Sequence, residues 1–120
     1  VYQRLAEVYL IRAEARTQQG KVSGDDSAAS DLNAVRLRAG LPETAAATQP
    51  DMLAAIEKER ICELFYEGHR WYDLKRTGRL DEVLGSLPWK AGNHQPYMNV
   101  LPIPVNELIA NPRITQNPGY

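Results

Sequence analysis

Three glutamates, Glu59, Glu63 and Glu67, recur at intervals of four residues and are followed closely by His69 and Asp73. On a helix this spacing places the three carboxylates in one stripe, where like charges repel. Carboxylates beside an imidazole could also supply the acid and the base of a hydrolase. However, the sequence has neither an H-E-x-x-H helix nor a G-x-S-x-G elbow, and ion-pair networks produce similar clusters. We therefore interpret the stripe as structural, and keep an acid/base hydrolase only as a remote alternative.

Arginines are interleaved with these glutamates. Arg60 falls on the apolar row of the predicted helix, between Ile56 and Leu64, and Arg70 is three residues from Glu67. A guanidinium on an apolar face is costly unless its donors find carboxylates. We expect a partly buried ion network that fixes how this helix meets its neighbours, with Glu63, Glu14 or Glu67 as the partner of Arg60. The predicted members of the network are Glu14, Glu59, Arg60, Glu63, Glu67, Arg70, Asp73 and Arg76.

The loop of residues 87–97 is the segment best suited to bind a sugar. Trp89 offers an aromatic face that could pack on the apolar face of a pyranose, and amide and imidazole groups close to it could hydrogen-bond hydroxyls. Loops held on a rigid scaffold often carry function. The predicted ligand-binding residues are Trp89, Asn93, His94 and Tyr97. Trp71, which lies within a helical segment, is expected in the core instead.

The histidines and the single cysteine indicate no metal site. His69 and His94 lie far apart and share no carboxylate spacing suited to zinc. The lone Cys62 excludes a cysteine cluster and an internal disulfide, and we interpret it as a small packing residue. We expect neither a catalytic residue nor a cofactor.

Charge and composition limit the classes of partner. The 14 basic and 15 acidic residues are spread along the chain and leave a net charge of -1, which disfavours nucleic acid as a partner. With 120 residues and 43% hydrophobic content, the chain can form one small domain. No stretch approaches the roughly 20 apolar residues needed to cross a bilayer.

Apolar periodicity predicts an all-α fold. Helices are expected over residues 2–19, 25–39, 50–66 and 70–76, the second capped by Asp25 or Asp26, with a further turn over 80–84. Two successive helical hairpins resemble a tetratricopeptide-like stack, although no clean repeat of about 34 residues is visible. The first helix is expected to bury a face made of Leu5, Val8, Tyr9 and Ala13. The run Val8 to Ile11, apolar all round, suggests contact on a second side as well.

The remainder of the chain is predicted to form an irregular, proline-rich strap. Prolines recur from residue 88 to residue 118 and leave room only for a short helix over 105–110. Apolar residues within the strap can anchor it, so we expect it to be docked, with Ile103 and Tyr120 touching helix side chains. The expected organisation is one domain over 1–120, helical to about residue 84 and irregular over 85–120.

Three segments resemble one known family. Residues 59–78 follow the pattern E-R-x-x-E-L-x-x-E-G-x-R-W-x-D-L-x-R-x-G, and the preceding helices carry Y-L-I-R-A-E-A at 9–15 and L-N-x-V-R-x-R-A-G-L at 32–41. The strap carries L-P-I-P at 101–104, N-P at 111–112 and Q-N-P-G-Y at 116–120. In this order, the segments resemble the C-terminal region of the SusD/RagB family, glycan-binding surface lipoproteins of the Bacteroidetes outer membrane.

The resemblance implies a non-enzymatic function. Such a protein captures oligosaccharide outside the cell and delivers it to a SusC-like TonB-dependent transporter, on which it sits as a lid. It also implies a tetratricopeptide-like scaffold and a larger parent protein, in which an N-terminal lipid, absent from this chain, provides the only membrane association. This chain would then be a C-terminal fragment that acts mainly as scaffold. The alternative from another class is a tetratricopeptide-like protein-interaction module.

Overall fold

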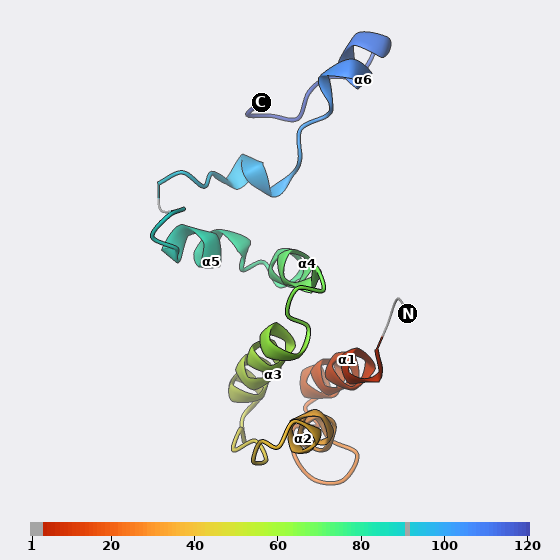
Figure 1. Cartoon of the computed structure of the whole chain (residues 1–120), viewed down its shortest axis with the longest axis vertical. Coiled ribbons are helices and arrows are strands. Elements are labelled where there is room, and N and C mark those ends of the chain that lie inside the picture. Colours follow the sequence, from red (N-terminus) through yellow and green to blue (C-terminus); the bar gives the residue numbers. More distant parts are fainter. Residues whose placement is uncertain (1–3, 91) are drawn as a thin grey trace. The chain divides into compact units, whose positions relative to one another are not determined.

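The computed structural model describes residues 4–90 and 92–120, and within them the regular elements are all helices (Figure 1). They are α1 (Leu5–Gln18), α2 (Ala28–Arg38), α3 (Gln49–Glu63), α4 (His69–Arg76), α5 (Leu80–Ser86), the 3-10 helix η1 (Pro96–Asn99) and α6 (Val105–Ala110). The all-α prediction is confirmed. In the described part of the chain no helix is both long enough and apolar enough to span a bilayer.

The chain divides into two compact units, Val1–His69 and Arg70–Tyr120. The first unit contains α1, α2 and α3, and the second contains α5, η1, α6 and nearly all of α4. The single domain expected from the sequence therefore stays a prediction.

Local side-chain chemistry explains where α2 begins and where α3 ends. The Ser27 hydroxyl accepts a hydrogen bond from the Ser30 amide at 3.3 Å, and the Ser30 hydroxyl accepts one from the Ser27 amide at 3.1 Å. This reciprocal cap sets the start of α2 at Ala28, slightly later than a cap at Asp25 or Asp26 would. The α3 helix ends at Glu63 rather than at the predicted Tyr66, which has a left-handed φ of 63°.

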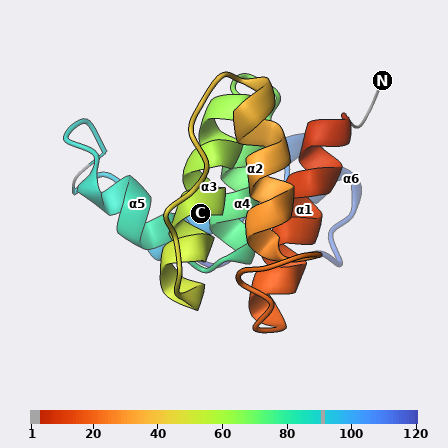
Figure 2. The same cartoon turned by 90° about the horizontal axis from the view of Figure 1, so that it is seen from below.

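In the first unit, α1 packs against both α2 and α3, and the three helices lie side by side (Figure 2). At one end, Gln49 Nε2 donates to Gln18 Oε1 at 3.3 Å, and at the other, Arg4 Nη1 lies 2.8 Å from Glu63 Oε1. Hence α1 runs antiparallel to α3. The buried core of the unit consists of Ala6, Leu10, Ala13, Ala28, Leu32, Val35, Met52 and Ile56.

The buried face of α1 agrees with the predicted one only in part. Ala13 is buried as predicted and Tyr9 packs against the core. In contrast, Leu5 is 71% exposed and Val8 is 47% exposed, while Ala6 and Leu10 are buried. The run from Val8 to Ile11 is apolar in every direction, so its periodicity does not fix which side faces inward. The small alanines suit a helix that must pack against two neighbours at once.

In the second unit, the strap closes on itself through side chains that bind its backbone. Gln116 Oε1 accepts from the Ile103 amide at 2.8 Å, and Gln116 Nε2 donates to the Ile103 carbonyl at 3.0 Å. The Tyr120 hydroxyl donates to the Val100 carbonyl at 2.9 Å. These bonds order the C-terminal residues along the segment 100–103, while the docking of Ile103 and Tyr120 on helix side chains stays a prediction.

A glycine permits the closest approach within the strap. The rings of Tyr97 and Tyr120 meet edge to face with centroids 5.1 Å apart. Gly119 lies against the Tyr97 ring with a φ of 98°, and a Cβ built on Gly119 would stand 2.4 Å from Tyr97 Cγ. Only glycine fits this position without displacing the ring.

Candidate functional site

The glutamates of α3 are bound by arginines from elsewhere in the first unit. Arg36, near the end of α2, places Nη1 2.9 Å from Glu59 Oε2. Arg38 Nη2 lies 2.6 Å from Glu63 Oε2, and Arg4, just before α1, places Nη1 2.8 Å from Glu63 Oε1. The like-charged stripe is therefore neutralised across helix contacts, which ties α1 and α2 to α3.

Arg4 also holds the turn that follows α3. Its Nη2 donates to the Glu63 carbonyl and to Glu67 Oε1, both at 2.6 Å, and its Nε donates to Glu67 Oε2 at 3.1 Å. The bonds to Glu67, and then those to Glu63, raise the pKa of the Arg4 guanidinium. Burial by itself raises the pKa of Glu63, but the bonds from Arg4 and Arg38 outweigh burial, and that pKa lies below its usual value. An ionised, doubly bound Glu63 is unsuited to act as a general acid at neutral pH.

The predicted burial of Arg60 is confirmed, since this residue is 7% exposed and its neighbour Glu59 is 5% exposed. The carboxylate that partners Arg60 stays a prediction, as do the places of Glu14 and Arg70 in the network. In the second unit, Arg76 Nε lies 3.0 Å from Asp73 Oδ1, one turn apart on α4.

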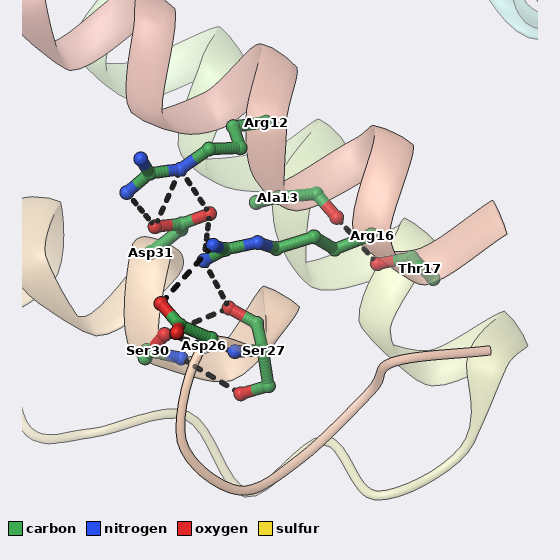
Figure 3. A network of polar contacts seen from close by, with 8 residues as sticks. All are labelled: Arg12, Ala13, Arg16, Thr17, Asp26, Ser27, Ser30 and Asp31. Carbon is green, nitrogen blue, oxygen red and sulfur yellow. Dashed lines mark hydrogen bonds and ion pairs between the residues drawn. The ribbon is translucent and has the colours of Figure 1, made fainter. Parts of the chain in front are cut away.

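A second polar centre joins α1 to α2 around Asp31, which is 2% exposed (Figure 3). Arg12 donates to this carboxylate through Nε at 3.0 and 3.1 Å and through Nη2 at 2.6 Å. Arg16 Nη1 donates to Asp31 Oδ2 at 2.9 Å, and Arg16 Nη2 donates to Asp26 Oδ1 at 3.3 Å. The bonds to Asp31 raise the pKa of Arg12. The buried carboxylate is thus satisfied from two successive turns of α1.

Neither this centre nor the arginines that bind the α3 glutamates were predicted from the sequence. The missed residues are Arg4, Arg12, Arg16, Asp31, Arg36 and Arg38. One usable signal was the spacing of Arg12 and Arg16, which lie one turn apart on a predicted helix. This spacing identifies Asp31 as the partner only once the antiparallel hairpin is known to place α2 beside the face of α1 that carries the two arginines.

The histidine of the candidate acid/base site lies beside α1. His69 Nδ1 stands 3.6 Å from Glu7 Oε1, and Glu7 is 8% exposed. Among residues 4–90 and 92–120, no three His, Cys, Asp or Glu side chains are grouped as ligands of a metal ion.

The predicted sugar-binding loop is fixed by one carboxylate of α5. His94 Nε2 and Asn99 Nδ2 each lie 2.8 Å from Asp81 Oδ1, and the His94 side chain is only 7% exposed. The bond from Asn99, and then that from His94, lowers the pKa of Asp81. The His94 imidazole is therefore committed to holding the loop against α5. In contrast, Trp89 is 71% exposed and Asn93 is exposed.

Two other aromatic residues were assigned roles from the sequence. The Tyr97 ring contacts Tyr120 and Gly119 and is 36% exposed, so its predicted contact with ligand stays a prediction. Trp71, predicted in the core, is 37% exposed. A helical pattern places Trp71 on α4 but does not tell how far its large ring extends beyond the apolar face. Of the four predicted ligand contacts, Trp89, Asn93 and Tyr97 are exposed, whereas the His94 side chain is buried.

Comparison with known proteins gives a consistent result. The SusD family model matches residues 1–120. The chain is 37% identical over 129 aligned residues to SusD-like protein P25 of Formosa agariphila, covering 98% of this chain and 24% of that protein. It is 36% identical over 123 residues to starch-binding protein SusD of Bacteroides thetaiotaomicron, covering 98% of this chain and 21% of that protein. The chain thus spans about a quarter of the length of the curated relatives that it matches.

Solved structures agree in fold. A SusD superfamily protein from Bacteroides vulgatus superposes with a TM-score of 0.88 and 30% identity, over 99% of this chain and 27% of that one. A SusD superfamily protein from Parabacteroides distasonis gives a TM-score of 0.81 and 28% identity, over 96% of this chain and 26% of that one. The SusD family model matches the chain from residue 1 to residue 120, so the chain belongs to the SusD family.

Proposed function

We propose that this chain is the C-terminal helical part of a SusD-like protein that captures oligosaccharide at the surface of the bacterial outer membrane. The complete protein would be a lipoprotein held at the membrane by an N-terminal lipid. It would pass its ligand to a SusC-like TonB-dependent transporter without chemical change. The observation that carries this proposal is the family match over residues 1–120, together with the likeness to a relative named for starch binding.

Within that protein, we assign the chain mainly a scaffold role. Support comes from the use of its charged side chains. Arg36 and Arg38 bind α3 glutamates, and Asp31 binds two arginines of α1. These groups hold helices together, as a scaffold requires.

A minor sugar contact is proposed at Trp89 and Asn93. The exposed indole can stack on the apolar face of a pyranose, and the amide can bond a hydroxyl. The clip from Asp81 to His94 and Asn99 holds this loop in place. One aromatic platform with few hydrogen bonds gives about 2–3 kcal/mol after ordering costs, short of the roughly 5.5 kcal/mol that a Kd of 100 µM requires. We therefore expect the isolated chain to bind oligosaccharides with a Kd above about 100 µM.

The proposal is tested on the full gene product. It should carry a lipoprotein signal, be encoded beside a TonB-dependent transporter, and retain that transporter when purified from outer membranes through a tag. It should also bind at least one oligosaccharide in calorimetric titrations against starch, xylan, mannan and host-type glycans. A product that binds no glycan but retains a soluble peptide or protein would instead favour the tetratricopeptide-like interaction module. Hydrolysis of a glycan by the purified protein would revive the acid/base alternative.

The role of Trp89 is tested separately. If it is a minor platform, Trp89→Ala in the full product weakens glycan binding by less than about tenfold, the equivalent of roughly 1.4 kcal/mol. A complete loss of binding in that variant, or a Kd below about 100 µM for the isolated chain, would place the main site in this region and contradict the scaffold assignment.

A further inference from the structure

Asp81 uses only one of its two carboxylate oxygens within the fold. His94 Nε2 and Asn99 Nδ2 both lie 2.8 Å from Oδ1. No described residue donates a hydrogen bond to Oδ2, and the Asp81 side chain is 54% exposed. The bond from Asn99, and then that from His94, holds the pKa of Asp81 below its usual value, so the carboxylate is ionised at neutral pH. Asp81 therefore presents a charged, unused acceptor to solvent.

The neighbouring carboxylate of Glu82 is used differently. Arg79 Nε donates to Glu82 Oε2 at 3.1 Å, and Arg79 Nη2 donates to Glu82 Oε1 at 3.2 Å. One guanidinium thus binds both oxygens, as in an ordinary two-pronged ion pair. In Asp81, by contrast, two donors on the same oxygen fix the orientation of the carboxylate. This preorganises Oδ2 for a ligand, because no further side-chain ordering has to accompany binding.

The exposed indole of Trp89 and the unused oxygen belong to the same part of the second unit. After α5 the chain turns, and residues 92–99 run back along that helix (Figure 1). Trp89 lies in the turn and is 71% exposed. The returning segment reaches the first turn of α5, where His94 and Asn99 bind Asp81. Along the helix axis, about 7.5 Å separates Asp81 from Ser86, the last residue of α5. The two groups are therefore associated with opposite ends of one short helix.

The chemistry of these two groups points to a neutral sugar. An ionised carboxylate oxygen accepts hydrogen bonds from hydroxyls, and such bonds are stronger than those to a neutral acceptor. A pyranose carries hydroxyls around its edge and an apolar face that an indole can cover. A sugar acid would instead bring a second carboxylate to the ionised Asp81, and like charges disfavour that contact.

We propose that Asp81 Oδ2 binds a hydroxyl of a neutral oligosaccharide, another ring of which stacks on Trp89. Asp81 is then a ligand-binding residue as well as the group that holds His94 and Asn99. The ligand is an extended oligosaccharide rather than one sugar, because its two contacts belong to opposite ends of α5. The inference rests on the proposed function, which supplies the oligosaccharide.

Fluorine NMR of the full gene product, labelled with 5-fluorotryptophan, tests this contact. The variant Trp89→Phe assigns the Trp89 resonance, which reports on this region even if sugar also binds elsewhere. The probes are maltotriose, xylotriose and mannotriose. The free energy proposed above for the Trp89 platform corresponds to a Kd on the order of 10 mM, so the titration extends to about 100 mM. At least one trisaccharide should shift the Trp89 resonance, and the absence of a shift with all three would overturn the proposal.

Two variants then separate Asp81 from its neighbour. Asp81→Asn keeps one oxygen as acceptor for His94 and Asn99 but places an amide donor where Oδ2 stands. It should weaken trisaccharide binding at Trp89 by at least about tenfold, the loss expected for one hydrogen bond to a charged acceptor. Glu82→Gln is the matched control, and its Kd should stay within about twofold of the parent value.

A direct contact also requires that Asp81→Asn leave the Trp89 resonance in place when no sugar is present. A resonance displaced without sugar would mean that Asp81 acts only by holding the loop, which overturns the proposal. An equal Kd for the parent and for Asp81→Asn would overturn it as well. Transporter retention and calorimetry of the full product do not depend on the Trp89 resonance. The proposed function can therefore stand while this contact fails, and a shift that requires Asp81 can be observed in a product that retains no transporter.

Discussion

Asp31 provides the sharpest test of the forces that hold α1 to α2. Its carboxylate is 2% exposed and receives hydrogen bonds from Arg12 and Arg16. Asp31→Ala removes an acceptor from two guanidinium groups at once. Breaking a buried pair by deleting one partner costs about 3–5 kcal/mol, because the other charge stays behind without compensation.

The expected loss lies below that range. The Arg16 side chain is 17% exposed and retains a contact with Asp26 at 3.3 Å, so its charge keeps some compensation. The Arg12 side chain is 53% exposed and can turn to water. We therefore expect Asp31→Ala to lower the free energy of unfolding by about 2–3 kcal/mol, with a fall in Tm of roughly 6–15 °C.

The assay is urea unfolding followed by far-UV circular dichroism, with Asp25→Ala as the control. Asp25 is exposed and lies in the same interhelical turn, so its removal should change stability by less than about 0.5 kcal/mol. A double-mutant cycle with Arg16→Met should give a coupling energy of at least about 1 kcal/mol. If Asp31→Ala were no more destabilising than the control, the Asp31 centre would be a surface feature without energetic weight, and the reasoning would be refuted.

Three further changes test other contacts. Arg60→Ala should lower stability by about 3 kcal/mol, since it leaves buried polar groups uncompensated, and an unchanged melting temperature would contradict this. Because the folded-state pKa of Glu63 is below its usual value, this group stabilises the fold above its unfolded-state pKa, and the contribution disappears as pH falls through the folded-state pKa. Glu63→Gln should therefore flatten the pH dependence of the Tm between about pH 5 and pH 2, and a curve parallel to that of the parent would exclude this role. Gly119→Ala should cost about 1–3 kcal/mol from backbone strain alone and expel the Tyr97 ring, which near-UV circular dichroism and proteolysis of residues 96–120 would detect. A native aromatic spectrum and unchanged cleavage would mean that the strap does not depend on this contact.

The sequence was informative about elements and much less so about partners. Breakers and periodicity placed the short helix Val105–Ala110 with its observed bounds and located the hairpin of α1 and α2. Local signals of this kind act over a few residues, so one chain is enough to see them. The buried face of α1 could not be predicted in the same way. Where a helix is apolar on every side, the spacing of its apolar residues does not indicate which side faces the core.

The partners of the α3 glutamates also could not be identified from the sequence alone. A glutamate at every fourth residue predicts that nearby cations neutralise the stripe. Arg60 and Arg70 were the nearest candidates along the chain. The structure adds Arg4, just before α1, and Arg36 of α2, whose positions beside α3 depend on the tertiary fold. In the candidate sugar loop, the sequence identified the exposed Trp89, but the burial of His94 depends on Asp81, 13 positions earlier.

In the long-range ion pairs of the first unit, the arginine precedes the glutamate in the sequence and is therefore synthesised first. Arg4 precedes its partner Glu67 by 63 positions, and Arg36 precedes Glu59 by 23. Since a chain emerges from the ribosome N-terminus first, these cations are already present when the acidic stripe of α3 is made. The repulsion along α3 can therefore be relieved as soon as the helix forms. If α3 were synthesised before α1 and α2, the stripe would emerge before the arginines that neutralise it.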